Sequence, residues 1–148
     1  MKTIVCQNRK ARFEYEVIET LEAGIVLQGT EIKSVREHRV SLDGSYAAVD
    51  DAGNVTLIGC NIDPYSHGNV HNHEPKRQRR LLLHRKQIRS FAEKAGVKGF
   101  TIVPLSMYLL KGKAKVELGV CRGKQLHDKR QTIKDRDVKK QLQRLNKS

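Results

Sequence analysis

Several features of secreted, membrane and metal-binding proteins are scarce or missing in this sequence. It has three cysteines, Cys6, Cys60 and Cys121, which lie far apart and form no C-x-x-C pair. This odd number and spacing argue against a disulfide framework and for a reducing compartment, where such cysteines are small buried or half-buried side chains. No apolar run approaches the roughly 18 residues of a membrane span, and residues 1–5 lack the apolar stretch of a secretory signal. We therefore expect a cytoplasmic protein with no membrane contact.

Aromatic residues are also few. Tryptophan is absent, and three Phe with four Tyr make up 5% of the chain. The hydrophobic pattern assigns most of them to the core, namely Phe13, Tyr15, Phe91 and Phe100. Few therefore remain for an exposed platform that stacks unpaired bases. The sequence also has no P-loop, nucleophile elbow, Rossmann glycine pattern, zinc-finger spacing or basic region with heptads, so nucleotide hydrolysis and the common DNA-reading motifs have no support.

What the sequence does contain is a strongly basic second half. The chain has 29 Lys and Arg against 16 Asp and Glu, a net charge of +13. Residues 1–75 hold seven basic and eleven acidic residues, whereas residues 76–148 hold twenty-two basic and five acidic ones. A merely soluble surface needs no such asymmetry, so we interpret the second half as facing a polyanion. With few aromatics to stack bases, a structured RNA recognised by shape, phosphate and 2′-hydroxyl contacts is the expected ligand.

Alternation and turn signals predict short strands joined by hairpins. The expected strands are residues 13–17, 25–27, 46–49, 55–58, 81–83, 100–110 (with an irregularity at Pro104) and 114–120, with hairpin turns at 50–54 and 111–113. One helix is expected to begin after Thr30 as its N-cap and to end at Arg39, with Ile32 and Val35 inward. A second is expected from about 84 to 95, with Ile88, Phe91, Ala92 and Ala95 on one face. We therefore predict a mainly β domain with helices, an antiparallel barrel over residues 1–122.

The pattern changes at residue 123. Residues 123–148 contain only five apolar residues of real size and are strongly basic. From Thr132 they indicate a helix, because Thr132 and Asp135 form a capping box and Val138, Leu142 and Leu145 share a face. An isolated helix of about 14 residues is marginal in water. We interpret residues 123–148 as a flexible basic tail, disordered when free and helical on a partner; a helix docked on the barrel is the alternative.

Two basic clusters within the domain are candidate phosphate contacts. The first comprises Lys76, Arg77, Arg79 and Arg80, and the second comprises Lys111, Lys113 and Lys115. Taken singly, such a run more often forms a solvated face. Together with the tail, however, the clusters could neutralise several phosphates, and they predict RNA binding that weakens by decades as salt rises.

Three histidines in one segment were considered as ligands or catalysts. His67, His71 and His73 follow Cys60, and a zinc site or a ribonuclease with two histidines as acid and base would use them. The zinc site needs an improbable loop closure, and no carboxylate is placed to orient the imidazoles. RNA contact or loop hydrogen bonding is favoured, and we expect no catalytic residue, metal or cofactor.

Seven segments, in order and with matching spacing, are similar to one known family. They are Asn8-Arg9-Lys10-Ala11, Glu22-Ala23-Gly24-Ile25, Gly29-Thr30-Glu31-Ile32-Lys33-Ser34, Pro64-Tyr65-Ser66-His67-Gly68-Asn69, Arg80-Leu81-Leu82-Leu83-His84, Lys115-Val116-Glu117-Leu118-Gly119 and His127-Asp128-Lys129-Arg130. Over nearly the whole chain the sequence resembles the small protein B family, the SsrA-binding proteins of bacterial trans-translation. The resemblance implies an oligonucleotide-binding (OB) barrel with flanking helices and a binding module without turnover. A basic, tailed structural protein of the ribosome is the competing interpretation.

The resemblance also implies partners. It implies binding to the tRNA-like domain of transfer-messenger RNA, which is charged with alanine and carried by elongation factor Tu to ribosomes stalled on messages without a stop codon. The expected RNA-binding residues are Asn8, Arg9, Lys10, Glu22, Lys33, Leu82, Lys113 and Lys115, of which Glu22, Leu82 and Lys115 match the family's RNA-binding surface. We expect a monomer that recognises the RNA through this surface.

The tail matches the part of the family that enters the empty mRNA channel and the decoding centre of the small ribosomal subunit. The residues expected to act there are Lys124, His127, Asp128, Lys129 and Arg130. Relatives usually carry a second lysine where this chain has Gln125, so one cation is missing next to the decoding motif.

Overall fold

The computed structural model describes residues 2–67, 71–95, 97 and 99–123. In chain order the elements are β1 (Lys2–Gln7), α1 (Arg9–Glu14), β2 (Tyr15–Ile25), α2 (Gly29–Arg36), β3 (Val40–Ser41), β4 (Tyr46–Val49), β5 (Val55–Ile58), β6 (Asn61–Ile62), β7 (Arg79–Leu82), α3 (Arg85–Ala95), β8 (Phe100–Leu110) and β9 (Lys113–Gly123). The described part is thus mainly β with helices, as predicted. Residues 124–148, and with them nearly all of the predicted tail, lie outside it.

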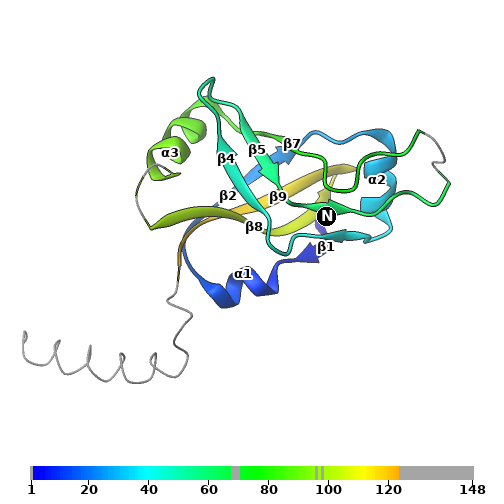
Figure 1. The fold of residues 1–148 in the computed structure, drawn as a ribbon, viewed down its shortest axis with the longest axis horizontal. Helices are drawn as coiled ribbons and strands as arrows, with labels where there is room; N and C mark the ends of the chain where they lie inside the picture. Colours follow the sequence, from blue (N-terminus) through cyan, green and yellow to red (C-terminus); the bar gives the residue numbers. More distant parts are fainter. Residues whose placement is uncertain (1, 68–70, 96, 98, 124–148) are drawn as a thin grey trace, which may run out of the picture.

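The main sheet is antiparallel and strongly curled. Its seven strands run in the order β1-β8-β9-β2-β7-β5-β4, and β3 pairs with β6 in a small second sheet. The curl brings β4 against β8, yet no ladder joins β1 to β4 within the described residues, so the barrel is not closed. Figure 1 shows β4 and β5 crossing over β8 and β9. The architecture is compatible with the predicted OB-like barrel, in an open form.

Helix α3 packs on the inner, core-lining side of the curled sheet. Phe91 of this helix is buried with Ile102, Val116, Leu118 and Val120 from β8 and β9. Apolar side chains on alternate positions of β9 face this core, as the spacing predicts. Two other inward predictions have different outcomes: Ile88 packs against the core from a half-buried position, whereas Ala92 is exposed.

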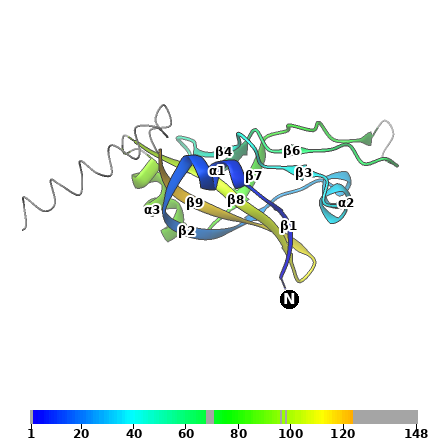
Figure 2. The same cartoon turned by 90° about the horizontal axis from the view of Figure 1, so that it is seen from below.

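Helix α1 covers part of the opposite face of the sheet. Figure 2 shows this helix in front of the sheet. Its Ala11 packs with Val103, Leu105 and Cys121. The close approach depends on Gly119, because a Cβ atom at this position would lie 2.8 Å from Cδ1 of Leu105. The sheet therefore buries side chains on both of its faces where α1 covers it.

The first predicted strand is wrong in part. Residues 13–17 were expected to form a strand, but Phe13 belongs to α1 and is 51% exposed, so it is not a core residue. Asn8 is the N-cap residue of this helix, and its side-chain oxygen accepts a hydrogen bond from the backbone amide of Ala11. The side-chain nitrogen of Asn8 donates to the carbonyls of Leu42 and Pro104. The strand starts only at Tyr15 and continues to Ile25, with a register shift between Val17 and Glu19, so residue 25 ends this strand and does not begin the separate one predicted over 25–27.

The hairpin of β4 and β5 and the long strand β8 have the predicted bounds, and β8 carries a bulge next to Pro104. Helix α2 differs, since it begins after Gln28 and not after Thr30, and it ends at Arg36. Its capping box joins Gln28 to Glu31. Val35 is buried as predicted. No helix among the described residues is long and apolar enough to cross a membrane.

Candidate nucleic-acid interface

A row of residues crosses five strands of the main sheet. Leu82 of β7 lies opposite Gly24 of β2, Gly24 lies opposite Lys115 of β9, Lys115 lies opposite Tyr108 of β8, and Tyr108 lies opposite Ile4 of β1. Their chain neighbours point into the core, so the row lies on the outer face of the sheet. We call these five residues the outer row.

Glu22 extends the outer row along β2. It lies two residues before Gly24 and therefore on the same face. The Tyr108 hydroxyl donates a hydrogen bond to Oε2 of Glu22. The Lys2 ammonium lies 4.0 Å from the centre of the Tyr108 ring. Burial, this hydrogen bond and the nearby Glu22 and Glu117 charges raise the pKa of Tyr108 well above its ordinary value, so the hydroxyl remains a donor.

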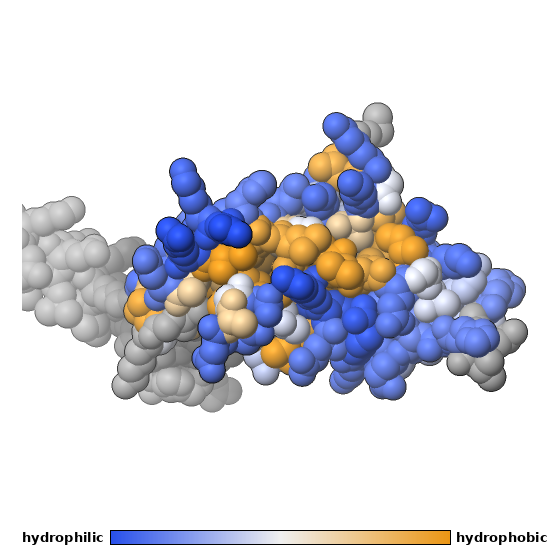
Figure 3. Space-filling view, turned by 90° about the horizontal axis from the view of Figure 1, so that it is seen from above, coloured by the Kyte–Doolittle hydropathy of each residue, from blue (hydrophilic) through white to orange (hydrophobic). Residues whose placement is uncertain are grey.

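The structure thus brings together the three residues that resemblance placed in the RNA-binding surface. Leu82 is 54% exposed, Lys115 is half-buried, and Glu22 is exposed. An apolar side chain, a cation and a hydrogen-bond acceptor share one face around a glycine that has no side chain. Figure 3 shows apolar side chains gathered in a band bordered by hydrophilic ones. Sequence reasoning missed Tyr108, because a tyrosine inside a strongly apolar strand looks like a core residue.

The other candidates lie in different places. Lys113 is exposed and lies two residues before Lys115 on β9, on the same face. Arg9 and Lys10 are exposed on α1, and Lys33 is exposed on α2, with its ammonium 5.3 Å from the centre of the Tyr65 ring. Asn8 differs from them, because it is 1% exposed and its side-chain bonds are made within the fold. It positions α1 and presents no group outward.

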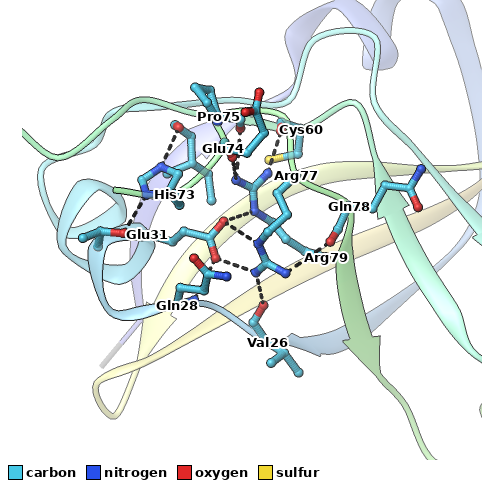
Figure 4. A network of polar contacts seen from close by, with 12 residues as sticks. Val26, Gln28, Glu31, Cys60, His73, Glu74, Pro75, Arg77, Gln78 and Arg79 are labelled. Atoms are coloured by element: carbon cyan, nitrogen blue, oxygen red, sulfur yellow. Dashed lines mark hydrogen bonds and ion pairs between the residues drawn. The ribbon is translucent and has the colours of Figure 1, made fainter. Parts of the chain in front are cut away.

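The first basic cluster is not a uniform phosphate-binding surface. Arg79 is fully buried, and its Nε donates to Oε2 of Glu31 at 2.5 Å (Figure 4). Its other nitrogens donate to the carbonyls of Cys60 at 2.7 Å and Pro75 at 3.0 Å. The expectation that Arg79 contacts phosphate is therefore wrong, because the charge is neutralised inside the protein.

Glu31 is the centre of this buried network. It also accepts from Nη2 of Arg77 at 2.6 Å and from the Gln28 amide at 2.7 Å. Burial alone raises the pKa of Glu31, but the hydrogen bonds from Arg77, Gln28 and Arg79 outweigh burial and hold the pKa below its ordinary value. The Glu31 carboxylate links α2 to Arg79, the first residue of β7, and to Arg77 in the segment before β7. The network therefore holds in place the strand that carries Leu82.

The three candidate histidines do not form a common site. His73 is buried, with Nε2 2.9 Å from the Ile62 carbonyl and Nδ1 2.8 Å from the Thr30 hydroxyl. The ring of His67 lies edge-on to Tyr65, and His71 is exposed. Across the described part of the chain, no three His, Cys, Asp or Glu residues are grouped so that they could hold a metal ion. His73 is a structural hydrogen-bonding residue of its loop.

An open, curled antiparallel sheet with lysines on one exposed face is compatible with an OB-like nucleic-acid-binding protein. The comparisons with known proteins agree with this class. The family model described as SmpB protein matches residues 5–148. The chain belongs to the SmpB family.

Individual relatives support the same assignment. The chain is 52% identical to an SsrA-binding protein of Listeria welshimeri over 141 residues, which is 95% of this chain and 91% of the relative. It is 48% identical to an SsrA-binding protein of Syntrophobacter fumaroxidans over 144 residues, 97% of this chain and 89% of the relative. A solved structure described as "tmRNA-SmpB: a journey to the center of the bacterial ribosome" matches with a TM-score of 0.70 and 46% identity, covering 84% of this chain and 87% of that chain.

Proposed function

We propose that this protein binds the tRNA-like domain of transfer-messenger RNA and helps to deliver that RNA to stalled ribosomes for trans-translation. The observation that carries the proposal is the outer row with Glu22, which places Leu82, Lys115 and a carboxylate on one exposed face. The similarity to SsrA-binding proteins over more than nine-tenths of the chain supports it.

The chemistry of this face suits a folded RNA. Lys115 and Lys113 can pair with phosphates, and Leu82 can pack against a ribose or a base face. Arg9, Lys10 and Lys33 are exposed cations that would add phosphate contacts where the RNA extends over α1 or α2. Such a surface binds by shape and charge, and the proposed role includes no covalent step.

The tail has a separate proposed task. Lys124, His127, Asp128, Lys129 and Arg130 would contact the decoding centre and the mRNA channel of the small ribosomal subunit. They lie outside the described residues, and the proposal rests on the family resemblance and on the net positive charge of residues 124–148. Elongation factor Tu would be met through the RNA complex, in the cytoplasm, with the protein acting as a monomer.

The first test is the identity of the RNA that copurifies with the tagged protein from cells. Sequencing is expected to show transfer-messenger RNA as the most enriched species. Stoichiometric ribosomal RNA that remains after a salt wash would instead support a structural ribosomal protein and would contradict the proposal.

The second test separates the two tasks. Deleting residues 124–148 is expected to leave the affinity for transfer-messenger RNA largely unchanged while abolishing the tagging of stalled chains. Loss of RNA binding in this variant would contradict the division between domain and tail. Incubation of the full-length protein with labelled structured RNA is expected to leave that RNA intact.

A further inference from the structure

We propose that Tyr108 positions the Glu22 carboxylate to read the hydrogen-bond-donating edge of an unpaired guanine in the bound RNA. The base would pack against Leu82, whose side chain leans over Gly24, with its phosphate near Lys115. This inference rests on the proposed function, because it requires RNA on the outer row. It assigns a chemical role to an acidic residue that phosphate binding alone does not explain.

A carboxylate is an unexpected member of a phosphate-binding face. It repels phosphates, and it accepts hydrogen bonds but cannot donate them when ionised. If Glu22 contacts RNA, its partners must therefore be N–H or O–H groups, which the bases and the 2′-hydroxyls supply. Glu22 also lies directly opposite Glu117 on β9. Like charges directly opposite each other destabilise a sheet, so the stability of the sheet does not explain why a carboxylate stands at position 22.

The two carboxylates are not equivalent. Glu117 is paired within the fold, with Arg12 at 3.9 Å and the Ser106 hydroxyl at 3.4 Å. Glu22 accepts only the Tyr108 hydroxyl, on Oε2, and within the described part of the chain its Oε1 has no hydrogen-bond donor. The acceptor left for a ligand is therefore on Glu22.

Tyr108 is placed to hold this carboxylate in one orientation. Its side chain is only 2% exposed, and the Lys2 ammonium lies against its ring. The hydroxyl restrains one oxygen of Glu22 and leaves the other without a donor among the described residues. A long exposed side chain would otherwise lose rotamer entropy when it binds, and a preformed orientation lowers that cost.

The spacing fits a single nucleotide. Neighbouring strands are about 4.8 Å apart, so Leu82 and Lys115 are roughly 10 Å apart across Gly24, and Glu22 lies roughly 7 Å further along β2. The Leu82 side chain leans over Gly24, because a Cβ atom at this position would lie 3.3 Å from Cβ and 3.6 Å from Cδ1 of Leu82. Guanine is the base with two adjacent donors, an imino and an amino group. One would meet Oε1 of Glu22 and the other the second lone pair of Oε2, whose first lone pair accepts the Tyr108 hydroxyl.

The test measures binding of an in vitro transcript of the tRNA-like domain across a range of salt. The variants are Glu22→Gln, Tyr108→Phe and the double variant, each checked for folding by urea unfolding. We expect each single variant to bind about tenfold more weakly, the usual size of one base-edge contact. The slope of log affinity against log salt should not change, because no phosphate contact is lost. The double variant should bind no more weakly than Glu22→Gln alone, because the two residues act through one contact.

Lys113→Ala is the matched control, since it should reduce the salt slope by about one unit. A second arm changes the RNA and replaces guanosines in unpaired positions of the transcript, one at a time, with inosine, which lacks the amino group. At one position, inosine should weaken binding of the wild type but not of Glu22→Gln.

The outcomes separate the inference from the proposed function. Additive losses in the double variant would overturn the positioning role of Tyr108, and an inosine transcript that binds normally at every position would overturn the reading of guanine. Failure of the wild type to prefer this transcript over an unrelated tRNA of equal length would overturn the proposed function itself.

Discussion

Nε of Arg79 lies 2.5 Å from Oε2 of Glu31, and both side chains are fully buried although 48 residues separate them in the chain. Two buried charges at this distance stabilise each other, whereas either one alone would be left without compensation in the interior. The pair therefore locks α2 onto the start of β7, the strand that also carries Leu82.

Glu31→Gln is expected to lower the free energy of unfolding by about 3–5 kcal/mol, because the buried Arg79 charge loses its counter-ion. Urea unfolding measures this change. Arg39→Gln is the control, since Arg39 and Asp63 form an exposed pair at 3.6 Å and its loss should cost less than about 1 kcal/mol. Equal losses in the two variants would contradict the central role of the buried pair.

Glu31 also predicts how stability depends on pH. Its folded pKa lies below the ordinary value of 4.5 that applies to the unfolded chain. The stabilisation is therefore fully present above pH 4.5 and is lost as the pH falls through the lower folded pKa. Urea unfolding of the wild type at decreasing pH should show this loss. In Glu31→Gln the free energy of unfolding should fall less steeply below pH 4.5. An equally steep fall would show that the pH dependence does not come from Glu31.

Gly119→Ala is expected to destabilise the fold by about 1–3 kcal/mol, because the added methyl group would overpack the contact between β9 and Leu105. Its Cβ would lie 2.8 Å from Cδ1 of Leu105 and 3.2 Å from Sγ of Cys121. Thermal unfolding is a sufficient measurement. Gly29→Ala has no neighbour within 4 Å of its Cβ and should leave stability unchanged or raise it. If Gly119→Ala were as stable as Gly29→Ala, the close packing of Leu105 on Gly119 would not contribute to the stability of the fold.

Lys115 and Leu82 should contribute to RNA affinity in different ways. Lys115→Ala is expected to reduce the salt slope of binding by about one unit, since one phosphate contact is lost. Leu82→Ala should weaken binding by roughly tenfold at every salt concentration, because only apolar contact is lost. Filter binding of the tRNA-like transcript over a salt series distinguishes the two. A changed salt slope in Leu82→Ala would contradict the assignment of a purely apolar contact to Leu82.

The three thiols should react slowly in the native protein. Burial raises the pKa of Cys60 to about 12 and that of Cys6 and Cys121 to about 11. Because the thiolate is the reactive form, a disulfide reagent at neutral pH should modify the half-buried Cys6 first. Cys60 and Cys121 should react only on unfolding. Mass spectrometry of the native and urea-treated protein tests this order, and early modification of Cys60 would show that its surroundings open.

Much of the sheet could be predicted from the sequence because its signals are local. The β4–β5 hairpin follows from the turn residues 50–54, and the inward side chains of β9 follow from alternation. Phe13 was assigned wrongly because helix α1 meets strand β2 at Tyr15, so that Phe13 and Tyr15 imitate the period of one strand. What begins the helix is Asn8, whose other bonds are to Leu42 and Pro104, distant in the chain.

The site was harder to predict than the fold. Arg79 and its exposed neighbour Arg80 look alike in the sequence, and only the distant Glu31 determines which of them is buried. Resemblance named Glu22, Leu82 and Lys115, but it gave no sign that Tyr108 holds the Glu22 carboxylate. That contact joins residues 86 positions apart, and it exists only because β8 and β2 flank β9.

Strand β9 begins with Lys113 and Lys115, for which we propose phosphate contacts, and it ends at Gly123, which lies opposite Tyr15. Eight residues separate Lys115 from Gly123, and in extended chain they span about 26 Å. The strand is therefore a spacer of fixed length, braced on both sides by β2 and β8. If RNA binds at Lys115 as proposed, the sheet sets the distance between that RNA and Gly123, the residue after which the tail begins. The proposed recognition of one RNA and the proposed placement on the ribosome would then be held in a constant geometric relation.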